Sequence, residues 1–206
     1  MVSSYPVQFD VDFPQRPLNR LTTAFRFLVA IPIVVLLTML SGQTFGDSDR
    51  RTTNELVIGG AAVFVPLVLM LVFRQKYPRW WFDWNLNLMR FSNRVTAYLA
   101  LLDDRYPSTD EDQSVHLDFP YPDTRQMNRW LPLVKWFLAI PHYFVLLFLG
   151  VGALGAVVLA WFAILFTGAY PRGLFDYVVG VIRWMNRVNG YAFTLITDQY
   201  PPFSLR

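Results

Sequence analysis

WFLAIPHYFVLLFLGVGALGAVVLAWFAILFTGA, residues 136–169, is a long apolar run that contains no Asp, Glu, Lys or Arg. As one helix it would be about 50 Å long, whereas the hydrocarbon core of a bilayer is about 30 Å thick. We therefore expect a tight turn around Gly150, Gly152 and Gly155 that folds the stretch into a helical hairpin. The two spans would cover about residues 131–149 and 151–167. Because this hairpin leaves little length to spare, a re-entrant hairpin is the alternative.

The stretch belongs to the second of two similar halves of the chain. Four motifs recur in the same order: FRFLVAIP (25–32) as VKWFLAIP (134–141), YPRWWFD (77–83) as YPRGLFD (170–176), RFSNRVTAY (90–98) as RWMNRVNGY (183–191), and LLDDRYP (101–107) as LITDQYP (195–201). We infer a tandem duplication of parallel repeats. Repeat 1 covers residues 1–108 and repeat 2 covers residues 109–206.

Repeat 1 contains the same kind of elements. Its spans are expected at about residues 23–40 and 56–73, joined by a polar loop. Lys and Arg flank the outer ends of the spans, and the hairpin tips are neutral or slightly acidic. The positive-inside rule then places both termini in the cytoplasm of a multi-pass protein. Arg26 and Lys135, at equivalent positions just inside their helices, are expected to snorkel to the interface.

An amphipathic helix is predicted after each hairpin, over about residues 80–102 and 172–196. Each has a polar stripe at helical spacing, formed by Asp83, Asn87, Arg90 and Arg94 and by Asp176, Gly180, Arg183 and Arg187. A narrow cationic stripe on an aromatic-rich helix is typical of one lying in the membrane interface. The alternative, a third crossing, would place two arginines in the hydrocarbon at high cost.

The arginines of these stripes are the candidate site. Arg90, Arg94, Arg183 and Arg187 could bind the phosphate headgroups of anionic lipids. The structural alternative pairs Arg90 and Arg183 with Asp83 and Asp176, or with the other copy. Tyr-Pro, which occurs six times, indicates aromatic anchoring at the membrane borders.

Smaller patterns complete the expected fold. VQFDVDFP (7–14) and SVHLDFPYP (114–122) alternate apolar and polar residues, so each predicts a short strand, and the two could pair on the cytoplasmic face. Gly152, Ala156 and Ala160 form a small-residue stripe suited to close helix packing within the hairpin or between chains. For His142 we expect a hydrogen bond to a backbone carbonyl. The fold class is an all-α integral membrane protein of two tandem repeats with short strands.

Composition restricts the chemistry. The chain is 54% hydrophobic and 16% charged, and it has no cysteine, which excludes disulfides, thiolate metal sites and cysteine nucleophiles. No nucleophile elbow, phosphate-binding glycine loop or metalloprotease motif occurs. We therefore expect a protein that is not an enzyme and that has no cofactor and no metal site.

The segments WLPLVKWFLAIPHYFVLLFLG (130–150), FAILFTGAYPRGLFDYVVGVIRW (162–184) and YAFTLITDQYPPFSL (191–205) strongly resemble the DUF4389 family of bacterial membrane proteins. The resemblance implies a location in the bacterial cytoplasmic (inner) membrane and brings no activity. We expect an accessory or structural subunit of a larger membrane complex. An anionic-lipid-binding or membrane-organising module and a small transporter or channel component are the alternatives. The expected partners are membrane lipids and a protein of the complex or a second copy, but no nucleic acid.

Overall fold

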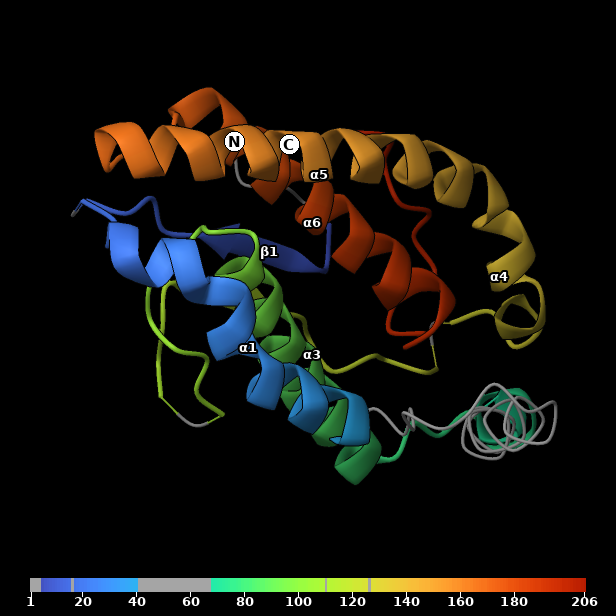
Figure 1. Cartoon of the computed structure of the whole chain (residues 1–206). Helices are drawn as coiled ribbons and strands as arrows, with labels where there is room; N and C mark the ends of the chain where they lie inside the picture. Colours follow the sequence, from blue (N-terminus) through green and yellow to red (C-terminus); the bar gives the residue numbers. More distant parts are fainter. Residues whose placement is uncertain (1–4, 16, 41–67, 110, 126) are drawn as a thin grey trace, which may run out of the picture.

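A computed structural model describes residues 5–15, 17–40, 68–109, 111–125 and 127–206. The described elements are β1 (Gln8–Val11), α1 (Arg20–Leu40), a π-helical turn η1 (Met70–Arg74), α3 (Arg79–Leu99), β2 (Val115–Asp118), a 3-10 turn η2 (Leu131–Leu133), α4 (Lys135–Leu138), α5 (Ile140–Thr167) and α6 (Arg172–Ala192). Figure 1 shows α5 running along α6 and α1 lying beside α3, with β1 between these two helix pairs. The structure is therefore mostly helical.

The two short strands form where the alternating segments predicted them. β1 and β2 pair antiparallel, with Phe9 opposite Leu117 and Asp10 opposite His116. Phe9 and Leu117 are buried while Asp10 and His116 are exposed. This is the alternation that a strand with one buried face requires. The expected pairing of the two segments is thus confirmed, and it joins the two halves of the chain.

The helical hairpin predicted around Gly150 is wrong. α5 is one continuous helix of 28 residues, about 42 Å long. A glycine ends a helix by adopting a positive φ, and among the described glycines only Gly168 does so, at 78°. Gly150, Gly152 and Gly155 keep helical geometry, so the chain passes through them. The expected spans 131–149 and 151–167 are therefore parts of a 3-10 turn, α4 and α5.

Within the described residues, α1 and α5 are the two helices long and apolar enough to cross a membrane. Both expose most of this apolar surface: only 22% of the α1 window and 11% of the α5 window is buried inside the protein. The polar loop expected in repeat 1 and most of its second span, residues 56–73, lie outside the described residues. The two exposed apolar helices support an association of the protein with a membrane.

The helices predicted after each hairpin are present as α3 and α6, with ends within four residues of those expected. Their apolar faces, however, are packed inside the protein rather than presented to a membrane interface. Phe82 and Met89 of α3 and Phe175, Val178 and Ile182 of α6 belong to one buried cluster. This cluster forms because α6 packs under α5 and against β1, and α3 packs against β2 and α1.

Candidate functional site

Arg90 of α3 reaches the strand of the second half. Its Nε donates to the carbonyl oxygen of Leu117 at 2.9 Å, and an Nη lies 3.4 Å from the carboxylate of Asp118. Asp83, the partner expected on the same helix, is exposed and takes part in no ion pair between described residues. The guanidinium of Arg90 thus holds the edge of β2.

Arg183 of α6 does the same for the strand of the first half. Its Nε donates to the carbonyl oxygen of Phe9 at 2.8 Å, one Nη donates to Leu205 at 3.0 Å, and the other lies 2.9 Å from the carboxylate of Asp10. The carboxylate partner is again on the other half of the chain, and not Asp176. Arg90 and Arg183 occupy aligned sequence positions and hold the strand pair from two sides.

The second arginine of each stripe is buried. Arg94 is 9% exposed and donates to the carbonyl oxygen of Ser108 at 2.8 Å, and Arg187 is 1% exposed and lies 5.9 Å above the ring of Tyr5. Both guanidinium groups therefore contact other residues of this chain inside the protein. Among the four arginines of the predicted site, only Arg90 and Arg183 keep partial exposure.

A pair of buried amides lies between α3 and α6. The side-chain nitrogen of Asn93 donates to the side-chain oxygen of Asn186 at 2.8 Å, and Asn186 returns the bond at 2.7 Å. The same nitrogens also donate to the backbone oxygens of Met89 and Ile182, one turn earlier on each helix. Sequence-aligned residues therefore meet each other and make the same secondary contact.

The basic residues expected to snorkel, Arg26 and Lys135, are instead enclosed, at 1% and 0% exposure. Arg26 donates to the carbonyl oxygens of Tyr98 and Asp103 at 2.9 and 2.8 Å and forms an ion pair with Asp104. Its guanidinium also lies 4.6 Å from the ring centroid of Tyr98. A buried cation needs this combination of a carboxylate and additional acceptors.

Lys135 lies in the equivalent pocket of the second half. Its Nζ donates to the carbonyl oxygen of Thr197 at 2.8 Å, lies 2.7 Å from the carboxylate of Asp198, and is 5.3 Å from the ring centroid of Tyr191. Burial lowers the pKa of Lys135, and the neighbouring Asp198 partly offsets this effect. The sequence held the signal for both pockets, because each cation, tyrosine and aspartate is present at aligned positions.

The loops that close the two pockets share a strained backbone residue. Leu101 has φ 65° and Leu195 has φ 56°, a conformation in which a leucine is rarely found. Both side chains are almost fully buried. The left-handed turn brings the carbonyl and carboxylate of the next residues back over the buried cation. The packing of the leucine side chains holds each turn in place.

Three of the tyrosines expected as membrane anchors are core residues. Tyr77 donates to the carbonyl oxygen of Thr194 at 2.7 Å, and its aligned partner Tyr170 donates to that of Ala100 at 3.4 Å. Tyr5 donates to Gln199 at 3.1 Å. Burial raises the pKa of all three phenols above the ordinary value. The other three, Tyr106, Tyr121 and Tyr200, remain exposed.

The small-residue stripe of α5 faces α6 rather than the other arm of a hairpin. A Cβ at Gly152 would lie 2.5 Å from the hydroxyl of Tyr177, and Ala156 and Ala160 are buried in the shared core. His142 of α5 is fully buried, and its Nδ1 accepts a hydrogen bond at 3.1 Å from the indole nitrogen of Trp184. Its partner is thus a side chain and not the backbone carbonyl that was expected. The stripe thus brings α5 and α6 close together.

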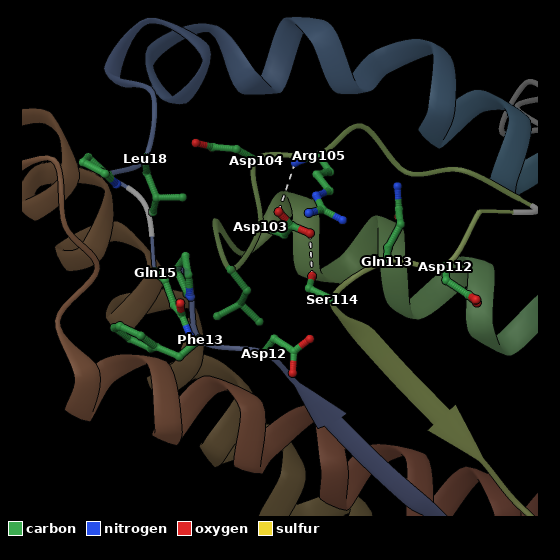
Figure 2. Close-up of a pocket in the computed structure, with 13 residues that line it drawn as sticks. Asp12, Phe13, Gln15, Leu18, Asp103, Asp104, Arg105, Asp112, Gln113 and Ser114 are labelled. Carbon is green, nitrogen blue, oxygen red and sulfur yellow. Dashed lines mark hydrogen bonds between the residues drawn. The ribbon is translucent and has the colours of Figure 1, made fainter.

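A cavity of about 530 Å³ lies between the entry to α1 and the connection after α3. Figure 2 shows Asp103 at its wall, accepting hydrogen bonds from the hydroxyl of Ser114 and the backbone nitrogen of Arg105. Asp104 is neutralised by Arg26, and Asp12 lies 3.0 Å from the ring of His116. No group of three or more His, Asp or Glu among the described residues could hold a metal ion. The lining is acidic, with its carboxylates largely occupied.

Residues 130–204 match the family described as Domain of unknown function (DUF4389). The match begins just before η2 and ends in the C-terminal tail, so it includes α4, α5, α6 and the Lys135 pocket. The family resemblance predicted from the sequence is confirmed for this half of the chain. No curated protein and no solved structure matches the chain.

Proposed function

We propose that this chain is a non-enzymatic, multi-pass protein of the bacterial inner membrane that acts as an accessory or structural subunit of a larger membrane complex. The observation that carries the proposal is the large apolar surface of α5. Its exposed large hydrophobic residues are Ile140, Phe144, Leu147, Phe148, Val151, Leu154, Val158, Leu159, Phe162 and Phe166. Soluble monomers rarely expose an apolar patch of this extent, so membrane or a partner is expected to cover it.

The use of the ionisable groups supports a structural role. Arg26, Lys135, Arg94 and Arg187 are buried and bonded to carbonyl oxygens of the chain. Arg90 and Arg183 clamp the strands. A buried cation held by carbonyl oxygens of its own chain contributes rigidity rather than reactivity. The chain thus offers a rigid body with apolar outer helices, as a scaffold subunit requires.

In this proposal the chain is organised as a tandem duplication of two repeats. The matched contacts of Asn93 with Asn186, and of Tyr77 and Tyr170 with opposite halves, support an approximate two-fold arrangement of two repeats. In such an arrangement each repeat completes the core of the other. The pairing of β1 with β2 fits the same relationship.

Native mass spectrometry of the tagged chain, extracted from its own membrane in native nanodiscs, tests the proposal. We expect a discrete larger complex with a fixed stoichiometry. Leu147→Ser and Leu154→Ser, on the exposed face of α5, should release the partner, whereas Phe193→Ser, similarly exposed at the end of α6, should not. A lone chain or a small homo-oligomer carrying only lipid would contradict the proposal.

A further inference from the structure

Two segments distant in sequence are joined beside α4. Thr124 donates through its hydroxyl to the carbonyl oxygen of Gln75 at 2.6 Å, and an Nη of Arg129 donates to the side-chain oxygen of Gln75 at 3.2 Å. Tyr121 donates to the backbone oxygen of Tyr77. These contacts tie the chain before α3 to the chain before η2, so their side chains form one surface.

This surface is strongly basic. Its exposed cations, called the basic patch here, are Arg74, Lys76, Arg79, Arg125 and Arg129. The two contributing segments, 73–80 and 121–130, contain a single carboxylate, that of Asp123. Of the ion pairs between described residues, none includes a side chain of the basic patch. The patch therefore keeps its positive charge toward the surroundings, unlike Arg94 and Arg187, which are buried.

Large aromatic side chains flank the basic patch. Phe73, Trp80 and Trp130 are 74%, 69% and 65% exposed, which places them among the most exposed apolar residues described. The guanidinium of Arg79 lies 5.3 Å from the ring centroid of Tyr121, in a cation–π contact that fixes its direction. Tryptophan is enriched at the headgroup level of membranes because its ring is amphipathic. Cations beside such rings are positioned for phosphate groups.

We propose that the basic patch binds the phosphate headgroups of anionic phospholipids, with Trp80 and Trp130 inserted at the headgroup level beside it. Near an anionic membrane surface each added Lys or Arg strengthens binding by about fivefold. The cavity lined by Asp12, Asp103 and Asp112 is formed by other segments, the entry to α1 and the connection after α3. The charge is thus unevenly distributed, and the basic side is the one that contacts anionic lipid.

This inference rests on the proposed function only for the presence of a membrane, and it needs no partner protein. The test uses the purified full chain in neutral detergent with equal amounts of phosphatidylglycerol and phosphatidylcholine, and native mass spectrometry counts the retained lipids. Preferential retention of phosphatidylglycerol, lost at high salt, is expected, because salt screens exposed charges. Equal retention of the two lipids overturns the proposal, whether or not a protein complex is found.

Variants locate the binding. Lys76→Gln/Arg125→Gln/Arg129→Gln should lower phosphatidylglycerol retention by at least about tenfold, since three cations are removed. The matched control, Arg20→Gln/Arg105→Gln/Arg172→Gln, removes three exposed cations elsewhere and should leave retention within about twofold. An equal loss in the control, or no loss in the first variant, overturns the proposal.

The variant Arg125→Lys/Arg129→Lys separates charge from fold. Lysine binds phosphate as a point charge, so this variant should retain phosphatidylglycerol as the wild type does. Unchanged circular dichroism and an unchanged melting midpoint of the three-Gln variant exclude unfolding as the cause of its loss. Loss of lipid in the lysine variant contradicts the proposed headgroup interaction.

Discussion

Asn93 of α3 and Asn186 of α6 each donate to the other's side-chain oxygen, at 2.8 and 2.7 Å, although they are 93 residues apart in sequence. They occupy the same place in two matching motifs, RFSNRVTAY and RWMNRVNGY. Both are buried, at 6% and 5% exposure. The reciprocal hydrogen bonds therefore join α3 and α6 at matching positions of the two motifs.

The two amides of this pair should depend on each other in their contribution to the free energy of unfolding. Asn93→Leu or Asn186→Leu leaves a buried amide without its partner, and each should lower the free energy of unfolding by about 1–3 kcal/mol. The double variant packs two leucines and should cost less than the sum of the two single changes. Chemical unfolding in detergent measures all four proteins. Strict additivity would show that the two amides do not depend on each other.

In the Lys135 pocket, removing the carboxylate should destabilise the protein more than removing the ammonium group. Asp198→Ala leaves a buried ammonium group without its carboxylate, and we expect a loss of about 3–5 kcal/mol. Lys135→Met keeps the length of the side chain, and the carboxylate of Asp198, 24% exposed, still accepts a hydrogen bond from the backbone nitrogen of Asn128. This second change should cost less, and the double variant should recover part of the loss of Asp198→Ala. A larger loss for Lys135→Met would contradict the enclosure of the ammonium group.

At Leu195, substitution by glycine should leave the protein more stable than substitution by alanine, which is the reverse of the usual order in a helix. Both substitutions remove a fully buried side chain and should destabilise the fold by about 2–5 kcal/mol. Because φ at this position is 56°, glycine avoids a strain of about 1–2 kcal/mol that alanine keeps. Leu195→Gly should therefore unfold at a higher denaturant concentration than Leu195→Ala. At Leu88, inside α3, the usual order with alanine more stable should hold.

Alkaline pH should destabilise the protein through Tyr5, Tyr77 and Tyr170. Burial raises the pKa of these three phenols, whereas in the unfolded chain they ionise near pH 10. Their contribution to stability is full below pH 10 and is lost as pH rises through the folded pKa values. Phenolate absorbance should show at least three of the ten tyrosines ionising only when the chain unfolds. Ionisation of all ten near pH 10 in the folded state would contradict the burial.

The sequence predicted the parts of this fold that rest on local pattern. Alternation located β1 and β2, and the matching motifs located α3 and α6. The sequence also left open that Arg90 and Arg183 would pair with the other copy. Their carboxylate partners are indeed Asp118 and Asp10 of the opposite halves. Local spacing indicates a helix face well, because residues three and four apart share it in any context.

The errors come from contacts that spacing does not reveal. The turn at Gly150 was inferred from bilayer thickness, yet Ala156 and Ala160 pack into the core, with α5 lying along α6. Snorkelling of Arg26 and Lys135 was inferred from their place near a helix end, while Asp104 and Asp198, far along the chain, enclose them. Their partners are distant in sequence, so only the recurrence of the same residues in both halves pointed to them.

α5 is one long helix, with one face against α6 and an exposed apolar face on the other side. Because the chain has no cysteine, single cysteines can be placed along residues 140–167 and spin-labelled in a bilayer. We expect oxygen accessibility with one unbroken helical period, high at Phe148, Leu154 and Phe162 and low at Ala156 and Ala160. Water-exposed labels at residues 150–155, with the period broken there, would contradict a continuous α5 and restore the hairpin.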